Sequence, residues 1–355
     1  MNNSGILRHG GEMHKVKNSM LYLIKILLAV LVAFIFANAI CFFYYSLPGT
    51  VSCSNHATDY TLIPGTTGFV GDEGYAELKV DSNGYNNQSV PDRVDILSMG
   101  SSHTLGYNVA PDENYSVLLG QKLADAGLSD DVNVYNIGMW YHYLPRSLRN
   151  LQAACEAYKP SRYVIVETPT IIFSDQELSA YLNDDMDVQK PNSRLLLKLK
   201  KMPYVALALH QLKNYMSNAG ASTTADNNAE VKNTEISEES QQDGMTGQML
   251  DKAETVCRKN NVRLIIMYHP QVCVDHQGQP YTEVTKEERS RFQSECEKRN
   301  IILCDMTDTF EQEYQQKHIL PDGFNNTTPG TGHLNKYGHR MIAEKLYEMI
   351  QEGEK

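Results

Sequence analysis

A serine and a histidine stand at two places where a parallel α/β protein would bring them together. The apolar run 94–99 ends abruptly at Gly100-Ser101-Ser102, and near the C-terminus His333 precedes an amphipathic stretch. A serine hydroxyl is a poor nucleophile until a nearby imidazole accepts its proton. The pair therefore predicts nucleophilic acyl chemistry, with Ser102 as the attacking residue and Ser101 as its competitor.

Short apolar runs alternate with helical patterns over the C-terminal two thirds of the chain. The runs have the length expected for strands covered on both faces. They are Arg93–Met99, Val132–Asn136, Tyr163–Glu167, Val262–Tyr268 and Ile301–Cys304. The expected helices are Glu113–Ala126, Leu144–Tyr158, Met245–Lys259, Lys286–Arg299 and Leu334–Gln351. This alternation predicts an α/β fold built on a doubly wound, parallel, five-stranded sheet of the flavodoxin-like type.

Residues with polar or small side chains follow several of the expected strands. Ser102, Gly138 and Thr170 each come shortly after a strand, and His269 directly follows another. The carboxyl ends of parallel strands share one edge of the sheet, where ligands bind in doubly wound folds. We therefore expect these residues to gather at one site, with His269 as a candidate substrate contact.

The N-terminal segment has the composition of a membrane anchor. A basic tail, residues 1–25, precedes Ile26–Tyr45, which has no charged side chain and is long enough to cross a bilayer. Basic residues before the span predict a cytoplasmic N-terminus and an extracellular C-terminal domain at the cell membrane. The alternative is a cleaved signal peptide, because Ala37-Asn38-Ala39 resembles a cleavage site. The apolar run continues beyond it to residue 45, which favours an uncleaved single-pass anchor.

Composition excludes several functions. The 355-residue chain has a formal net charge of −11 and a sequence pI near 5.5, which argues against a nucleic-acid partner. Its seven cysteines show no metal-ligand spacing, and the odd number does not indicate a disulfide framework. No phosphate-binding glycine-rich loop or His/Cys cluster occurs, so we expect neither a metal nor a cofactor.

Three further segments complete the expected organisation. Residues 46–90 are rich in Gly, Asn, Asp, Ser and Pro, and predict a stalk with a small β-hairpin. Residues 91–353 form the α/β domain. Within it, 193–217 is helical in pattern and partly basic, which suits a surface helix slightly better than a cap over the substrate groove. The polar insertion 218–244 is expected to be disordered.

The chain resembles the SGNH/GDSL hydrolase superfamily over roughly residues 91–352. The similar motifs are Gly100-Ser101-Ser102, Asn136-Ile137-Gly138 and His333-Leu334-Asn335. The resemblance implies that Ser102 attacks an acyl carbonyl and that His333 takes its proton. It also implies that the N–H groups of Ser102 and Gly138 hold the oxyanion, with Asn136 beside them.

Two positions depart from the family pattern. Thr170 stands near the place of the third motif's Asn, where its hydroxyl would be a weaker donor. The Asp three residues before the family's histidine is replaced by Gly330. Asp322 is a candidate for the orienting acid, and the alternative is a Ser–His dyad oriented by a backbone carbonyl.

The resemblance implies a membrane-anchored, extracytoplasmic serine esterase or acyltransferase that works through an acyl-serine. Its expected substrates are acyl esters, acetyl above all, of cell-envelope glycans such as polysaccharides, and the bilayer holds the anchor. A membrane-bound O-acyltransferase is a further candidate partner. The alternative is a catalytically degenerate SGNH domain that binds glycan or scaffolds such an acyltransferase.

Overall fold

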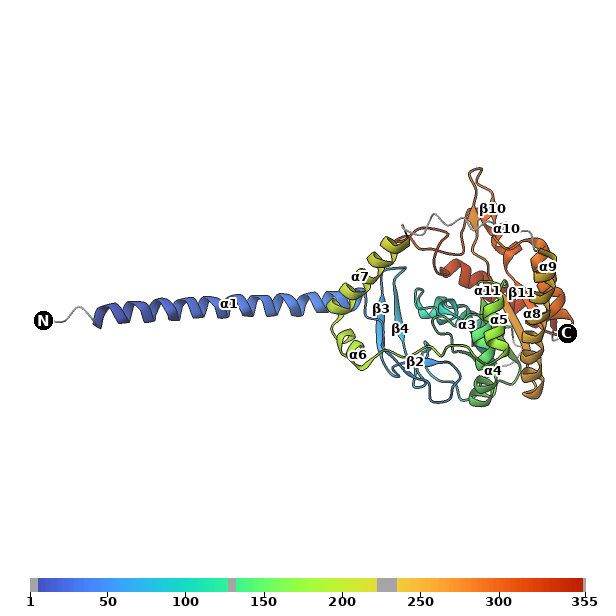
Figure 1. Ribbon diagram of the computed structural model, residues 1–355, viewed down its shortest axis with the longest axis horizontal. Coiled ribbons are helices and arrows are strands. Elements are labelled where there is room, and N and C mark those ends of the chain that lie inside the picture. Colours follow the sequence, from blue (N-terminus) through green and yellow to red (C-terminus); the bar gives the residue numbers. More distant parts are fainter. Residues whose placement is uncertain (1–5, 127–131, 222–234, 354–355) are drawn as a thin grey trace.

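The computed structural model describes residues 6–126, 132–221 and 235–353. A single long helix, α1 (Ile6–Tyr44), projects from an α/β body that holds the rest of the chain (Figure 1). Its segment Lys17–Tyr44 is apolar and long enough to cross a membrane, and a signal sequence would pass the same test. Almost all of its side chains from residue 18 onward are exposed, because only the C-terminal part of α1 contacts the body.

The body is built on the predicted sheet. Its strands are β5 (Ile96–Met99), β6 (Val134–Asn136), β7 (Tyr163–Thr168), β8 (Arg263–Tyr268) and β11 (Ile302–Asp305). All neighbours are parallel, in the order β11-β8-β7-β5-β6. Relabelled by position in the sheet, this is the 2-1-3-4-5 order of flavodoxin-like folds, so the predicted fold class is confirmed.

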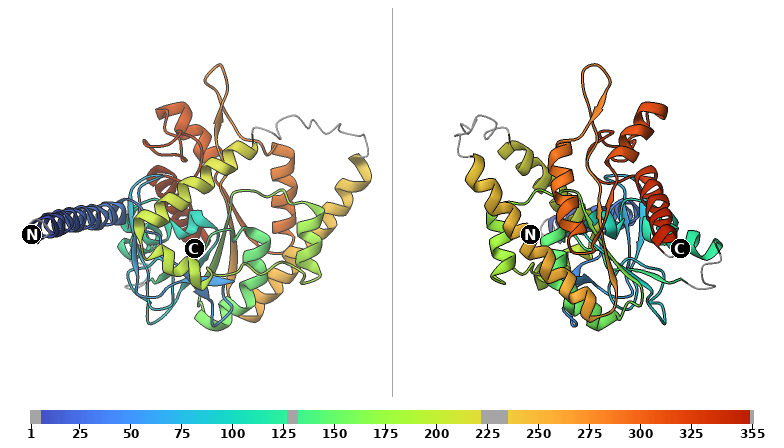
Figure 2. Two further views of the ribbon diagram at one scale, coloured as in Figure 1. Left: turned by 60° about the vertical axis from the view of Figure 1, so that its left-hand side comes forward. Right: turned by 90° about the vertical axis from the view of Figure 1, so that its right-hand side faces the viewer.

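The two faces of the sheet bury different helices. Side chains alternate along the strands, so Val164 and Val166 of β7 enter one core while Tyr163 and Ile165 enter the other. The first face is covered by α4 (Leu144–Tyr158), α5 (Asp175–Leu182), α8 (Glu235–Lys259) and α9 (Lys286–Glu297). The second is covered by α3 (Tyr115–Asp125), α10 (Thr307–Lys317) and α11 (Lys336–Gly353), as the turned views show (Figure 2).

Short elements connect or extend this frame. They are α2 (Ser102–Leu105), the 3₁₀ helix η1 (Pro111–Glu113), and the antiparallel pair β9 (Cys273–Val274) and β10 (Pro280–Tyr281).

Within the described residues all seven cysteines are unpaired thiols.

The segment that we expected to be a stalk packs against the body. It contains two antiparallel pairs, β1 (Thr50–Ser52) with β2 (Tyr60–Leu62), and β3 (Thr67–Val70) with β4 (Ala76–Lys79). The β3–β4 hairpin lies within the segment for which we expected a hairpin, and Leu78 of β4 joins the main core, as do Tyr60 and Tyr85. This burial means that residues 46–90 act as part of the domain rather than as a spacer.

A buried ion cluster fixes this segment to the sheet-covering helices. The Asp59 carboxylate, 2% exposed, pairs with Arg146 at 2.7 Å and with Arg149, both on α4. It also accepts the backbone N–H of Gln189 at 2.9 Å. Burial raises the pKa of Asp59, but the hydrogen bonds and the nearby cations outweigh it and leave that pKa lowered.

The basic segment after β7 forms two helices, α6 (Arg194–Lys200) and α7 (Pro203–Ala221), that lie beside the end of α1 (Figure 1). Much of the predicted disordered insertion, residues 222–234, lies outside the described residues. Its two ends are helical, because α7 reaches Ala221 and α8 begins at Glu235. Extending an existing helix needs no new nucleation, which explains how polar residues 235–244 continue the buried part of α8.

Candidate active site

Ser102 lies at the start of α2, where the chain turns sharply after β5. Gly100 has φ +153°, and a Cβ there would lie 2.5 Å from Glu167 Oε2 and 2.3 Å from Thr104 Oγ1. Only glycine fits this approach. Ser101 caps α2, its Oγ accepting the N–H of His103. The turn therefore places Ser102 at the carboxyl end of the sheet with its side chain partly exposed.

His333 meets Ser102 directly. The His333 Nε2 and Ser102 Oγ atoms are 2.9 Å apart, although the two residues are 231 positions apart in sequence. His333 lies in the loop before α11, which Asn335 begins by accepting the N–H groups of Tyr337 and Gly338. The expected pairing of serine and histidine is thus present in the geometry.

The carboxylate on the far side of the imidazole belongs to Glu73, not to Asp322. Glu73 Oε2 lies 2.5 Å from His333 Nδ1, and Glu73 Oε1 accepts the His333 backbone N–H at 2.7 Å. With Nδ1 donating to Glu73, Nε2 is free to accept the Ser102 proton. Asp322 is buried and its Oδ2 has no hydrogen-bond partner, so the prediction of Asp322 as orienting acid is wrong.

Side-chain amides hold the loop that carries Glu73. Asn326 accepts the N–H of Gly74 and donates to the carbonyls of Gly71 and Gly74, at 2.9 to 3.0 Å. Asn108 donates to the carbonyl of Glu73 at 2.8 Å. These bonds fix the β3–β4 connection against two loops of the body, so the carboxylate is positioned before any substrate arrives.

A second serine–carboxylate–histidine set lies immediately behind the first. The Glu167 carboxylate accepts from the Ser101 N–H, the Ser101 hydroxyl and the Thr104 hydroxyl at 2.7 to 2.9 Å, and lies 2.8 Å from His269 Nε2. Burial raises the pKa of Glu167, but the hydrogen bonds and the charge of His269 outweigh it and leave that pKa lowered. Ser101, 0% exposed, is therefore excluded as the nucleophile.

One of the two expected oxyanion donors, the Gly138 N–H, is occupied within the protein. The Gly138 N–H donates to Asn136 Oδ1 at 2.8 Å, and Asn136 Nδ2 donates to the Thr104 carbonyl at 2.6 Å. The Thr170 hydroxyl donates to the carbonyl of Ile172 and accepts its N–H. These three residues do gather at the predicted edge of the sheet, but their polar atoms stabilise the loops in this conformation.

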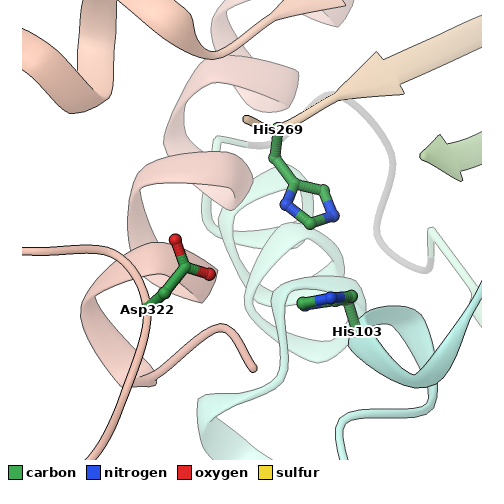
Figure 3. Close-up of side chains that lie close together, drawn as sticks. All are labelled: His103, His269 and Asp322. Carbon is green, nitrogen blue, oxygen red and sulfur yellow. The ribbon is translucent and has the colours of Figure 1, made fainter. Parts of the chain in front are cut away.

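Next to Ser102, three side chains from separate segments of the chain line a cavity of about 250 Å³ and lie close together (Figure 3). They are His103 on α2, His269 after β8, and Asp322 between α10 and α11, and one ligand-type atom of each lies within 4.8 Å of the others. His103 Nδ1 accepts the N–H of Leu334 at 3.2 Å. A neutral His103 then carries its proton on Nε2, which makes it a hydrogen-bond donor rather than a metal ligand.

A larger cavity of about 450 Å³ lies between α7, the end of α1 and the active-site loops. Tyr107 connects it to the site, since its hydroxyl is 3.4 Å from His333 Nε2 and its ring packs edge-on against Trp140. The lining combines aromatic rings with amide side chains, among them Tyr60, Tyr107, Trp140, Gln189 and Asn192. Such a lining suits a ligand with both apolar faces and hydroxyl groups.

Comparisons with known proteins found similarity only to solved structures, at low sequence identity and low TM-score. No protein-family model matches the sequence, and no curated protein is significantly similar to it. Similar solved structures include a lipolytic protein of the G-D-S-L family from Veillonella parvula, 15% identical, covering 72% of this chain and 97% of its own, at TM-score 0.39. An acetyl xylan esterase, AlAXEase, is 12% identical, covers 72% and 100%, and has TM-score 0.39. A putative arylesterase from Agrobacterium tumefaciens is 11% identical, covers 72% and 98%, and has TM-score 0.37.

The sequence motifs did not identify Glu73, His103, Tyr107 or Glu167. Glu73 lies outside the predicted α/β domain and 260 residues before its partner, where no local spacing signals a catalytic acid. His103 directly follows Ser102, and Glu167 ends the predicted strand Tyr163–Glu167, three residues before Thr170. A carboxylate buried at the end of a strand is the signal that identifies Glu167 in retrospect.

Proposed function

We propose that the chain is a serine esterase or acyltransferase of the SGNH type that works through an acyl-serine. The observation that carries this proposal is the continuous series Ser102 Oγ, His333 Nε2, His333 Nδ1 and Glu73 Oε2, with separations of 2.9 and 2.5 Å. A serine, its base and the base's orienting acid within hydrogen-bond reach define an activated nucleophile. The degenerate alternative rests on the missing Asp and on the missing Asn of the third motif, and Glu73 supplies a carboxylate for the first of these.

The roles follow from the geometry. Ser102 Oγ attacks the carbonyl carbon of an ester while His333 Nε2 accepts its proton. The tetrahedral intermediate collapses to an acyl-serine as His333 returns the proton to the departing alcohol. Water or a sugar hydroxyl then gives a proton to His333 and attacks the acyl carbon, and His333 returns that proton to Ser102 Oγ as the free acid or the new ester departs. Glu73 stabilises the imidazolium formed in both halves.

The proposed substrates are acyl esters, acetyl above all, of cell-envelope glycans. The aromatic and amide lining of the larger cavity supports this, because sugar rings present apolar faces to aromatic side chains and hydroxyls to amides. We place the α/β body outside the cell with α1 as an uncleaved, single-pass anchor. The basic N-terminal tail and the apolar segment Lys17–Tyr44 support this orientation.

A covalent probe tests the nucleophile. The full chain in detergent is treated with a fluorophosphonate, and its intact mass and peptide map are measured. We expect one adduct, on Ser102, and none when His333 is replaced by Ala. His318→Ala is the matched control, because His318 is exposed at the end of α10. Equal labelling of wild type and the His333 variant would overturn the assignment.

Acetate release from acetylated polysaccharide tests the substrate class. We expect release by wild type and none by the Ser102→Ala variant, and an added sugar acceptor distinguishes transfer from hydrolysis by yielding an acylated product. A protein that labels at Ser102 but never releases acetate from any acetylated glycan would keep the acyl-serine and refute the glycan substrate.

A further inference from the structure

Helices α6 and α7 form a hairpin that reaches back along the anchor. Before α6, the N–H of Asn192 donates to Thr50 Oγ1 at 2.8 Å, just outside the end of α1. At the start of α7, the N–H of Tyr204 donates to Asn38 Oδ1 at 3.2 Å, and its ring lies 6.3 Å from that of Phe34. The turn between α6 and α7 therefore lies beside the outer part of α1 (Figure 1).

The depth of this turn follows from helix geometry. Phe34 and Asn38 are ten and six residues before the end of the 28-residue apolar segment Lys17–Tyr44, or about 15 and 9 Å along its axis at 1.5 Å per residue. The whole segment is about 42 Å long on the same rise, which matches a bilayer with its headgroups, roughly 40–45 Å thick. With α1 spanning, the turn lies within the outer leaflet.

The side chains of the hairpin suit that position. Leu195, Met202 and Tyr204 are 68%, 38% and 49% exposed, and the Tyr204 ring packs edge-on against Phe34 of α1. Lys198 and Lys201 are also exposed. Residues 188–221 contain six Lys or Arg and no Asp or Glu, in a chain whose net charge is −11. Apolar side chains beside basic ones are typical of helices that lie in the interface of anionic membranes.

We propose that the α6–α7 hairpin is inserted in the outer leaflet, where its apolar side chains contact acyl chains and its lysines contact anionic headgroups. This inference rests on the proposed membrane anchor. The larger cavity, lined in part by Leu196, Ala206 and Leu209 of these helices, then lies at the membrane surface. The esters that reach it are those presented at the lipid headgroups, such as a glycan carried on a lipid.

Quenching by brominated lipids tests the insertion. The full chain is reconstituted in nanodiscs of phosphatidylcholine and phosphatidylglycerol, with or without brominated acyl chains. Its one tryptophan, Trp140, gives a background measured in wild type. In Met202→Trp and Leu195→Trp, we expect the brominated chains to remove about half of the added emission, as for side chains 5–10 Å below the headgroup boundary. Tyr281→Trp, 49% exposed in the β9–β10 pair, should be unquenched.

A probe in the anchor separates the two proposals. Phe36 is 65% exposed in α1, so Phe36→Trp should be strongly quenched when α1 spans the disc. In one outcome, Phe36→Trp is quenched but Met202→Trp and Leu195→Trp are quenched no more than Tyr281→Trp. That result would overturn the hairpin insertion and leave the anchor intact. It would also assign the hairpin surface to a protein partner. Absence of quenching at Phe36→Trp would refute the anchor itself.

Discussion

The molecule contains the same three side-chain types twice, side by side. In the outer set, the His333 imidazole lies between the Ser102 hydroxyl and the Glu73 carboxylate. In the inner set, the Glu167 carboxylate lies between the Ser101 hydroxyl and the His269 imidazole. Because adjacent serines begin the two sets, the order of the three groups distinguishes them more than composition does.

The order decides what each set can do. An imidazole in the middle accepts the serine proton on one nitrogen and donates to the carboxylate from the other. A carboxylate in the middle only accepts, so it holds both neighbours and activates neither. Exposure follows the same division, since the His333 and Glu73 side chains are 23% and 20% exposed and those of His269 and Glu167 are 2% and 0%. The outer set suits catalysis and the inner set suits stability.

The strongest test of the difference between the two sets is to replace each serine by alanine in turn. Ser102→Ala should lower kcat for a chromogenic acetyl ester by on the order of 10⁴-fold or more, because no acyl-serine can form. Ser101→Ala should lower kcat by less than about tenfold, since its hydroxyl only binds Glu167 and caps α2. Comparable losses in both variants would show that the inner set takes part in catalysis.

Removal of the outer carboxylate should have the next largest effect. Glu73→Gln leaves an amide in place of the acceptor for His333 Nδ1–H, and we expect kcat to fall by on the order of 10³- to 10⁴-fold. Asp322→Asn is the control, with a loss below about tenfold, because Asp322 does not contact Nδ1. The reverse ranking in the same ester assay would restore Asp322 as the orienting acid.

The inner carboxylate should matter for folding. Glu167→Gln removes a buried charge that four donors surround, and we expect a loss of about 3–5 kcal/mol in the free energy of unfolding. Denaturant titration followed by circular dichroism measures it. Glu77→Gln, at an exposed position of β4, should change stability by less than about 0.5 kcal/mol. An unaltered midpoint for the Glu167 variant would contradict the structural role.

Asp322, between the two sets, should make stability depend on pH. Burial raises its pKa from 3.8 to about 7, so between these values the unfolded chain ionises and the folded chain does not. The free energy of unfolding therefore falls as pH rises from about 4 to 7 and is constant above pH 7. The total decrease is roughly 4 kcal/mol, at about 1.4 kcal/mol per pKa unit. The stability of Asp322→Asn should therefore increase relative to that of wild type as pH rises from about 4 to 7. A constant difference in melting temperature from pH 4 to 8 would refute this.

The smallest expected effect concerns the approach to the outer set. The Tyr107 hydroxyl, 3.4 Å from His333 Nε2, makes a long contact with the nitrogen that must accept the Ser102 proton. Tyr107→Phe keeps the ring against Trp140 and should change kcat by less than about threefold in either direction. A loss as large as that in Glu73→Gln would make the hydroxyl part of the catalytic machinery.

Most of the sheet and two of the three residues of the outer set could be predicted from sequence. Five buried strands have local apolar patterns, so 163–168 and 263–268 were found to within a residue or two. Ser102 and His333 have recognisable neighbours in sequence. The α5 and α10 helices were missed because their short, polar sequences carry a weak periodic signal.

The acid could not be predicted because its position depends on packing between distant segments. Glu73 belongs to a hairpin whose place is set by the side chains of Asn108 and Asn326. No local sequence pattern encodes those contacts, and a glutamate followed by a glycine is common in ordinary loops. The same reason explains why Gly138 and Thr170 gathered at the expected edge while their polar atoms were already engaged.

The connection between α1 and the α/β body fixes the position of the candidate site relative to α1. Tyr45 pairs with Val70 of β3, the Ser46 N–H donates to the Phe69 carbonyl at 2.8 Å, and Phe42 and Phe43 pack on the Phe69 ring. A stalk would let an active site sweep through a volume above the bilayer. Here Val70, the last residue of the strand that leads to Glu73, pairs with Tyr45 directly after α1, so the candidate site is held at one height and one tilt relative to that helix. With α1 as the proposed anchor, the esters that reach Ser102 are selected by their distance from the membrane before any pocket recognises them.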